Sequence, residues 1–138
     1  MITITSDLMT HVHLIDEQHK ELFNCINAVE SIGDEAAENA EIEKAEVEKT
    51  LDFLGSYIVK HFGEEEELQI RYGYPKHNWH HEMHVWYIAE YHKLRAEYES
   101  NGFSAHFLHL LNESIMKWFV RHVKNVDVEL GKFISERM

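Results

Sequence analysis

The chain has 138 residues, of which 44% are hydrophobic and 12% aromatic, which is enough to bury the core of one globular domain and excludes a disordered chain. Its net charge of −12 argues against nucleic acid or an anionic membrane as a partner, because both would repel it. Cys25 is the only cysteine, so we expect no intrachain disulfide and a reducing, cytoplasmic location. There is no signal-peptide pattern, and no stretch approaches the about 20 apolar residues of a membrane span.

The N-terminal residues 2–15 are rich in β-branched side chains and lack helical periodicity, which predicts an extended arm laid across the domain. We expect His11 and His13 in this arm to face solvent. Asp16 is predicted to cap a first helix over residues 16–32, with Gly33 as its C-cap. His19 lies at the centre of the apolar stripe of this helix, which is formed by Ile15, Leu22, Ile26 and Val29.

The acidic segment 34–49 is predicted to be an exposed loop that passes into the first turns of a second helix. That helix should end near residue 72, because Pro75 forbids its continuation. His61 and Glu65 are four residues apart and therefore share one helical face. The rest of this face is apolar, so the pair must be mutually compensated or bind a metal. The apolar members of the face are Val47, Leu51, Leu54, Ile58 and Leu68.

A third helix is predicted from about Lys76 to Ser100, with Gly102 as its stop. Its inward face is defined by Tyr87, Tyr91, Leu94 and Tyr98. The helical period places His80 and His84 within this face and His77 and His81 towards one edge. The margin is small, so periodicity favours the His80/His84 pair without proving it.

A fourth helix should start near Ser104, and its stripe contains Leu108, Leu111, Ile115, Trp118, His122 and Val126. Asp127 follows His122 by five residues, so it can reach a shared site only from the side or through local distortion of the helix. A short C-terminal helix is predicted over 128–136. Four amphipathic helices with short connections predict an all-α, up-down-up-down four-helix bundle with an extended N-terminal arm, forming a single domain over residues 1–138.

Each predicted helix thus carries inward histidine or carboxylate side chains, and together these form a candidate metal site. One such histidine would ordinarily be a hydrogen-bonded core residue, but core packing alone does not require five buried imidazoles. Imidazole with carboxylate suits iron, zinc or manganese, and seven ligands exceed the needs of one tetrahedral zinc. No histidine has a glutamate three residues before it, which disfavours a ferritin-like site. The candidate ligands are His19, His61, Glu65, His80, His84, His122 and Asp127.

This spacing resembles that of the bacterial hemerythrins over nearly the whole chain, from about residue 12 to residue 133. The matching segments are Asp16-Glu17-Gln18-His19, His61-Phe62-Gly63-Glu64-Glu65, Gly73-Tyr74-Pro75 with His80 and His84, and Trp118-Phe119 with His122 and Asp127. The resemblance selects His80 and His84 on the third helix, leaving His77 and His81 as outer or surface residues.

The resemblance implies two iron ions joined by Glu65, Asp127 and an oxo or hydroxo bridge. One iron would take His80, His84 and His122, and the other would take His19 and His61, with an open position that binds dioxygen. A dry apolar wall beside an open metal position admits a small ligand and excludes water. The expected wall residues are Leu22, Phe62, Trp118, Phe119 and Val123.

The chain departs from the family pattern at three places. Phe119 stands where leucine is usual beside the oxygen pocket. Gln69 replaces a methionine, and we expect it to contribute only peripheral packing. The arm has Ile4 and His11 near positions where the family has tryptophan and glycine. These departures affect expected ligand access and affinity rather than the metal ligands.

The leading hypothesis is a non-enzymatic protein that binds dioxygen reversibly for storage, delivery or sensing, with an unknown redox or receiving partner. The second is a di-iron enzyme that reduces peroxide or nitric oxide, or oxidises ferrous iron. These two would differ in the supply of protons and electrons near the open position. A third is a structural bundle that holds zinc or an incidental metal.

Overall fold

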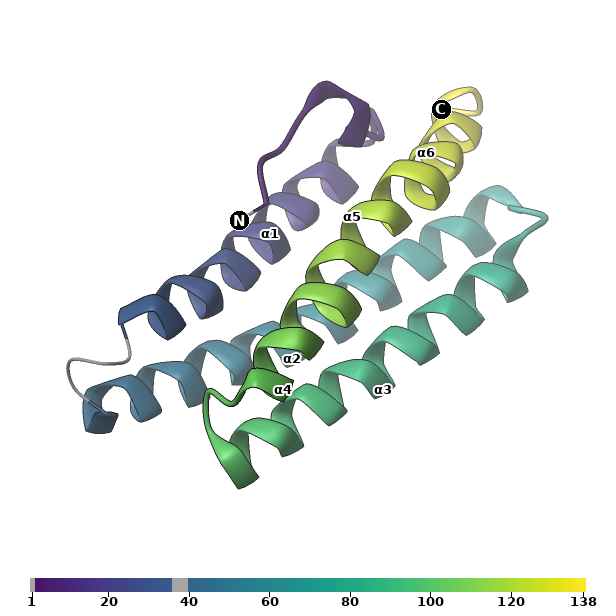
Figure 1. Ribbon diagram of the computed structural model, residues 1–138. Helices are drawn as coiled ribbons and strands as arrows, with labels where there is room; N and C mark the ends of the chain where they lie inside the picture. Colours follow the sequence, from purple (N-terminus) through teal and green to yellow (C-terminus); the bar gives the residue numbers. More distant parts are fainter. Residues whose placement is uncertain (1, 36–39) are drawn as a thin grey trace.

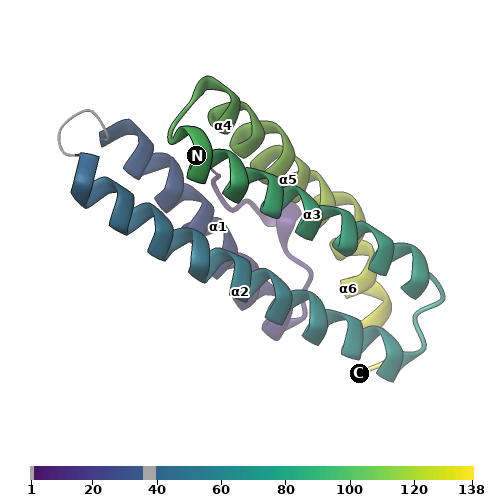
Figure 2. The same ribbon diagram turned by 90° about the horizontal axis from the view of Figure 1, so that it is seen from below.

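The computed structural model describes residues 2–35 and 40–138, which form an up-down-up-down bundle of long helices (Figures 1 and 2). Helix α1 packs against α2, α2 against α3, and α3 against the fourth, composite helix, as predicted. None of the described helices combines the length and the apolar character that crossing a membrane requires. The described elements are α1 (His13–Glu35), α2 (Ala40–Tyr72), α3 (His77–Asn101), α4 (Ala105–Leu110), a π-helical segment (Leu111–Lys117), α5 (Trp118–His122), a second π-helical segment (Val123–Asp127) and α6 (Val128–Ser135).

The junction between α3 and α4 follows the local sequence signals. Gly102 has a positive φ of 63°, and its N–H donates to the carbonyl of Tyr98 at 2.8 Å, which ends α3. Ser104 Oγ then accepts a hydrogen bond from the N–H of Phe107 at 2.9 Å and caps α4. The predictions for the end of the third helix and the start of the fourth are therefore confirmed.

The first helix begins earlier than predicted, at His13, so Asp16 is not its N-cap. The Asp16 carboxylate instead accepts hydrogen bonds from the Thr10 N–H at 2.8 Å, the Thr10 hydroxyl at 2.7 Å and the His11 N–H at 3.1 Å. These bonds satisfy donors of the arm rather than donors of the helix. The arm is correspondingly shorter than predicted, although both His11 and His13 are exposed, as expected.

The arm crosses the bundle and packs on α6. It contains a short 3-10 turn at Ser6–Leu8, and Leu8 and Val12 are buried. A Cβ atom at Gly131 of α6 would lie 2.3 Å from the carbonyl oxygen of Thr10, so this contact requires glycine. At the other end of α1, the helix continues through Gly33 to Glu35, and the predicted cap at Gly33 is wrong. Part of the predicted acidic loop, residues 36–39, lies outside the described residues.

The fourth helix runs without interruption from Ala105 to Ser135, so the predicted C-terminal helix is its continuation. The two π-helical segments change the helical phase, because each turn holds more residues than an α-turn. Leu108, which was predicted to be buried, is 40% exposed, and the neighbouring Phe107 is buried instead. Leu111, Ile115 and Val126 are buried as expected.

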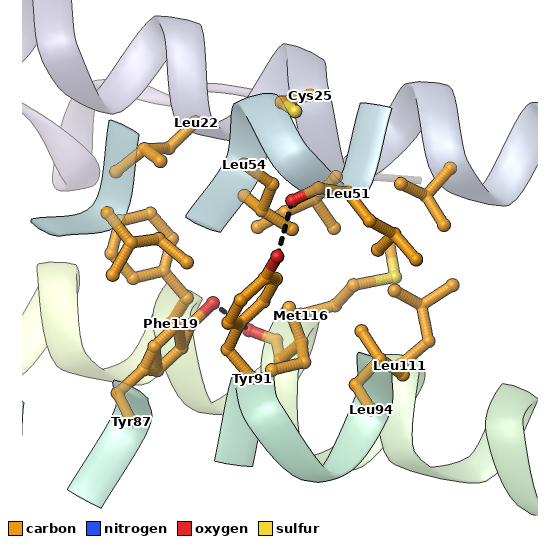
Figure 3. Packing of buried hydrophobic residues seen from close by; sticks show 14 of the residues in the cluster. Leu22, Cys25, Leu51, Leu54, Tyr87, Tyr91, Leu94, Leu111, Met116 and Phe119 are labelled. Carbon is orange, nitrogen blue, oxygen red and sulfur yellow. Dashed lines mark hydrogen bonds between the residues drawn. The ribbon is translucent and has the colours of Figure 1, made fainter. Parts of the chain in front are cut away.

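The core consists of two apolar clusters at different depths of the bundle. The larger one fills the part shown in Figure 3, where Tyr87 and Tyr91 cross between helices. The smaller one contains Val12, Ile15, Tyr74, Leu130 and Ile134. The candidate ligands lie where the two clusters meet. On α1, His19 lies between Ile15 of the smaller cluster and Leu22 of the larger one, and on the fourth helix Asp127 lies between Leu130 and Val123.

Candidate metal centre

The structure brings all seven candidate ligands together in one buried layer, and none of them is more than 4% exposed. They form two groups whose ligand atoms lie within 4.8 Å of one another. The first group has Glu65, His80, His84, His122 and Asp127, and the second has His19, His61, Glu65 and Asp127. Glu65 and Asp127 belong to both groups.

The two shared carboxylates are oriented so that each directs a different oxygen to each group. Glu65 Oε1 lies 3.0 Å from His80 Nε2 and 3.2 Å from His84 Nε2, whereas Oε2 lies 3.4 Å from His61 Nε2 and 3.9 Å from His19 Nε2. This arrangement is the one that a carboxylate bridging two cations would need.

Asp127 repeats the pattern from the opposite helix. Its Oδ1 lies 2.9 Å from His80 Nε2 and 3.1 Å from His122 Nε2, and its Oδ2 lies 3.0 Å from His19 Nε2. Residue 127 reaches this position because Val123–Asp127 is π-helical. With i→i+5 hydrogen bonding, a side chain five residues after His122 returns to the same face. The predicted local distortion is therefore confirmed.

The polar atoms of this layer fit a metal centre better than a hydrogen-bonded core. Within the described chain, Nε2 of His19, His61 and His84 and all four oxygens of Glu65 and Asp127 are buried without a hydrogen-bond partner. These atoms lie near one another but are not aligned for hydrogen bonds. Such an arrangement is expected when the lone pairs of several ligand atoms point towards a shared metal position. Leaving so many buried polar atoms unsatisfied is costly, and imidazole nitrogen with carboxylate oxygen is a donor set for iron, zinc or manganese.

The electrostatics of the metal-free cluster point the same way. Burial by itself would raise the pKa of Glu65 and Asp127, but contacts with the surrounding histidines outweigh it and hold both pKa values well below their ordinary range. Burial lowers the pKa of His61. At His80, burial acts in the same direction, but the close carboxylates of Asp127 and Glu65 prevail and raise the pKa to about 10. Protons on histidine thus balance the two carboxylates, and bound cations would replace those protons.

Three polar side chains outside the ligand set hold the imidazole rings, a role that was not predicted for any of them. Gln18 Oε1 accepts a hydrogen bond from His61 Nδ1 at 2.7 Å, which leaves Nε2 of that ring as the free donor to a metal. Gln18 Nε2 donates in turn to Glu64. Glu66 Oε2 lies 3.3 Å from His84 Nδ1, and Glu66 Oε1 contacts the exposed ring of His81.

Gln69 is fully buried, and the expectation of peripheral packing is wrong for it. Its amide nitrogen lies 3.0 Å from His80 Nδ1 and its amide oxygen 2.9 Å from His77 Nδ1. One amide thus links a candidate ligand to the half-buried His77. The signal in the sequence was its position four residues after Glu65, which places it on the same face of α2. For Gln18, the signal was its position three residues after Ile15 and four before Leu22, at the edge of the apolar stripe of α1.

The five residues predicted to form an apolar wall surround the layer. Leu22, Phe62, Phe119 and Val123 are buried, and Trp118 is half-buried. The Phe62 ring stacks on His84 with centroids 3.7 Å apart, and the edge of Phe119 meets His19 at 5.7 Å. Trp118 stacks on His122 at 4.6 Å. These contacts cover the imidazoles of both groups with aromatic surface.

Comparisons with known proteins agree with this geometry. The model of the hemerythrin HHE cation binding domain family matches residues 10–134. The chain is 29% identical over 140 residues to a bacteriohemerythrin of Methylococcus capsulatus, covering 98% of this chain and 97% of that protein. It is 25% identical over 124 residues to a bacteriohemerythrin of Stenotrophomonas maltophilia, covering 88% and 73%. A crystal structure of a mutant hemerythrin superposes with a TM-score of 0.78 at 26% identity and covers 98% of each chain.

Proposed function

The chain belongs to the hemerythrin family, and from this premise we propose that it is a non-heme di-iron protein that binds dioxygen reversibly. The observation that carries the proposal is the orientation of Glu65 and Asp127. Each carboxylate directs one of its oxygens to the first histidine group and the other oxygen to the second. Iron is the metal we assign, because this donor set suits it and the seven ligands nearly fill the octahedral coordination spheres of two ions.

The ligands divide between the two ions according to the two groups. His80, His84 and His122 would hold one iron, and His19 and His61 the other, with Glu65 and Asp127 shared. The group with fewer histidines leaves room for an external ligand. When bound, the two irons supply the reversible electron exchange that dioxygen binding requires.

The protein's own contribution is orientation and exclusion of water. Gln18 fixes the ring of His61, and the stacked Phe62 fixes the ring of His84. The wall residues Leu22, Phe62, Phe119 and Val123 carry no acid, base or thiol that would donate a proton to the external ligand. Dry apolar walls disfavour proton entry, so the ligand is released intact and the protein carries dioxygen rather than consuming it.

The proposal extends to the whole chain and its location. We assign residues 1–138 to one hemerythrin-like domain, with dioxygen as the ligand and the cytoplasm as the compartment. The cytoplasmic assignment rests on the single, buried Cys25, whose thiol has a pKa raised to about 11 by burial, as expected of a structural cysteine. Fractionation of cells that express the protein with its native N-terminus would test this location.

Elemental analysis and optical spectroscopy test the central proposal. Protein from iron-replete cells should contain two irons per chain. The reduced protein should gain a charge-transfer absorption band on exposure to dioxygen and lose it on purging with inert gas, over repeated cycles. One metal per chain, or mainly zinc, would contradict the di-iron assignment. Rapid conversion to a stable diferric form, or sustained peroxide turnover with an added reductant, would instead identify an enzyme.

A further inference from the structure

Three aromatic rings form a continuous stack from the protein surface to a candidate ligand. Trp86 of α3 is 45% exposed, and its ring stacks on Trp118 with centroids 5.4 Å apart and an interplanar angle of 30°. Trp118 in turn stacks on His122 at 4.6 Å and 12°. We propose that Trp86 and Trp118 are the path by which single electrons pass between a donor in solution and the metal centre.

The enclosure of the site is the first reason for this proposal, which rests on the proposed di-iron function. No candidate ligand is more than 4% exposed, so an outer-sphere donor cannot touch the ligands directly. Electron tunnelling weakens steeply with distance through gaps and is supported by π-systems in contact. The Trp86–Trp118–His122 stack supplies such contacts. It joins α3 to the fourth helix, and the two helices lie side by side in the bundle (Figures 1 and 2).

Neighbouring aromatic residues do not offer an equivalent route. Tyr87 also contacts Trp118, at 4.6 Å, but it is 1% exposed. Its hydroxyl donates to the carbonyl of Ile115 at 3.0 Å, and a carbonyl is no base for the proton that an oxidised phenol must lose. Trp79 has the same 45% exposure as Trp86 on the same helix, but its ring lies under Lys76 Nζ at 5.7 Å. Trp79 therefore provides a matched control.

The path would serve to restore a centre that has become oxidised. Each donor molecule loses one electron, and each electron converts one ferric ion to a ferrous ion, so two donors return the diferric centre to the diferrous state. The same contacts would carry electrons inward when hydrogen peroxide meets the diferric protein. Peroxide takes up two electrons and two protons and becomes two water molecules, and Trp86 and Trp118 would each supply one electron and one indole proton.

The first test measures reduction of the iron-loaded diferric protein by hexaammineruthenium(II), a one-electron outer-sphere donor. Trp86→Leu should slow reduction severalfold, Trp86→Phe should fall between it and the wild type because a ring is retained, and Trp79→Leu should match the wild type. Iron content and azide binding should be unchanged in all three variants. Equal reduction rates for Trp86→Leu and Trp79→Leu would overturn the path.

The second test measures modification of the tryptophans instead of reduction of the centre. Diferric and metal-free protein would be treated with hydrogen peroxide, and oxygenated tryptophan would be mapped by mass spectrometry. Because Trp79 and Trp86 are equally exposed, oxidation from solvent should modify both alike in the metal-free protein. In the iron-loaded protein, Trp86 should be oxygenated more than Trp79. Equal oxygenation of the two tryptophans in the iron-loaded protein would overturn the path. A chain that binds no iron would refute the proposed function and this inference together, whereas normal iron and oxygen binding with no Trp86 effect would refute this inference alone.

Discussion

The apolar layer of Figure 3 and the polar layer beside it are both inaccessible to solvent, but they treat their buried polar groups differently. In the apolar layer, the Tyr91 hydroxyl donates to the Leu51 carbonyl at 2.6 Å and the Tyr87 hydroxyl to the Ile115 carbonyl at 3.0 Å. In the polar layer, the oxygens of Glu65 and Asp127 have no hydrogen-bond partner within the described chain. The protein's own atoms satisfy the buried tyrosine hydroxyls of the first layer, whereas the carboxylates of the second layer require a bound cation.

This difference predicts two kinds of stability within one bundle. The apolar layer draws on burial and hydrogen bonds, which are present whether or not metal is bound. The polar layer carries buried charge, which is stabilising only when it is compensated. Metal should therefore contribute strongly to the free energy of unfolding, and substitutions in the two layers should respond differently to metal removal.

The largest effect is expected from His80→Ala. Removing one member of a buried charged cluster should cost more than about 3 kcal/mol of unfolding free energy and should empty at least one metal position. His81→Ala is the control, because His81 is exposed and contacts Glu66. Iron analysis and thermal unfolding measure both effects. Loss of iron from His81→Ala but not from His80→Ala would show that the wrong pair on α3 was assigned.

Gly55→Ala should damage the apolar layer alone. A Cβ at Gly55 would lie 2.5 Å from the Tyr91 hydroxyl oxygen, so the ring must move and its bond to Leu51 is strained. Overpacking of this kind costs about 1–3 kcal/mol. Denaturant unfolding should show the same loss in the iron-loaded and metal-free proteins, with unchanged iron content.

Gly63→Ala is its control on the same helix, since a Cβ there meets nothing within 4 Å. This substitution should stabilise α2 by about 0.5–1 kcal/mol, because alanine is the better helix former. A destabilisation by Gly63→Ala as large as that by Gly55→Ala would contradict the steric explanation.

Gln69→Leu should weaken the polar layer without removing a ligand. The leucine side chain keeps much of the buried volume but loses both contacts to His80 and His77. Loss of such a partner typically reduces metal affinity about 10–100-fold. Competition with a chelator measures this effect. His77→Ala should reproduce part of it, and an unchanged affinity in both variants would make the Gln69 contacts incidental.

The metal-free polar layer should also make stability depend on pH. Burial alone would lower the pKa of His80, but its close contacts with the carboxylates of Asp127 and Glu65 raise it from 6.5 to about 10. The folded state thus holds a proton that the unfolded chain loses above pH 6.5, so this contribution is complete below pH 6.5 and disappears as the pH rises towards about 10. Chemical denaturation of metal-free protein should show this decline, and the iron-loaded protein, whose His80 is held by metal, should show less of it.

The smallest effect on stability is expected at the boundary of the two layers. Phe119→Leu removes the ring edge that faces His19, which should change the rates of azide and dioxygen binding while two irons remain bound. Phe107→Leu, also buried but near the other end of the same helix, should leave those rates unchanged. Stopped-flow absorption distinguishes the two variants. Identical kinetics for both would remove Phe119 from the ligand's path.

Local sequence patterns were sufficient wherever one helix alone sets the outcome. The 3.6-residue period places His61 and Glu65 on the buried face of α2, whereas on α3 it only favoured His80 and His84, which the structure buries. Capping chemistry places the turn between Gly102 and Ser104. These features depend on backbone geometry within a few residues, so the amino-acid sequence by itself determined them.

Tertiary structure decided the features in which one segment competes with another for the same groups. Asp16 could have capped a helix, but the arm held against Gly131 presents the N–H groups of Thr10 and His11 to it instead. The π-helical turns bring Asp127 to the shared site, and the approach of α2 to α3 turns Gln69 into a partner of His80. A single helix has no preference for these arrangements. They arise because buried polar groups must find partners on other helices once the bundle has closed.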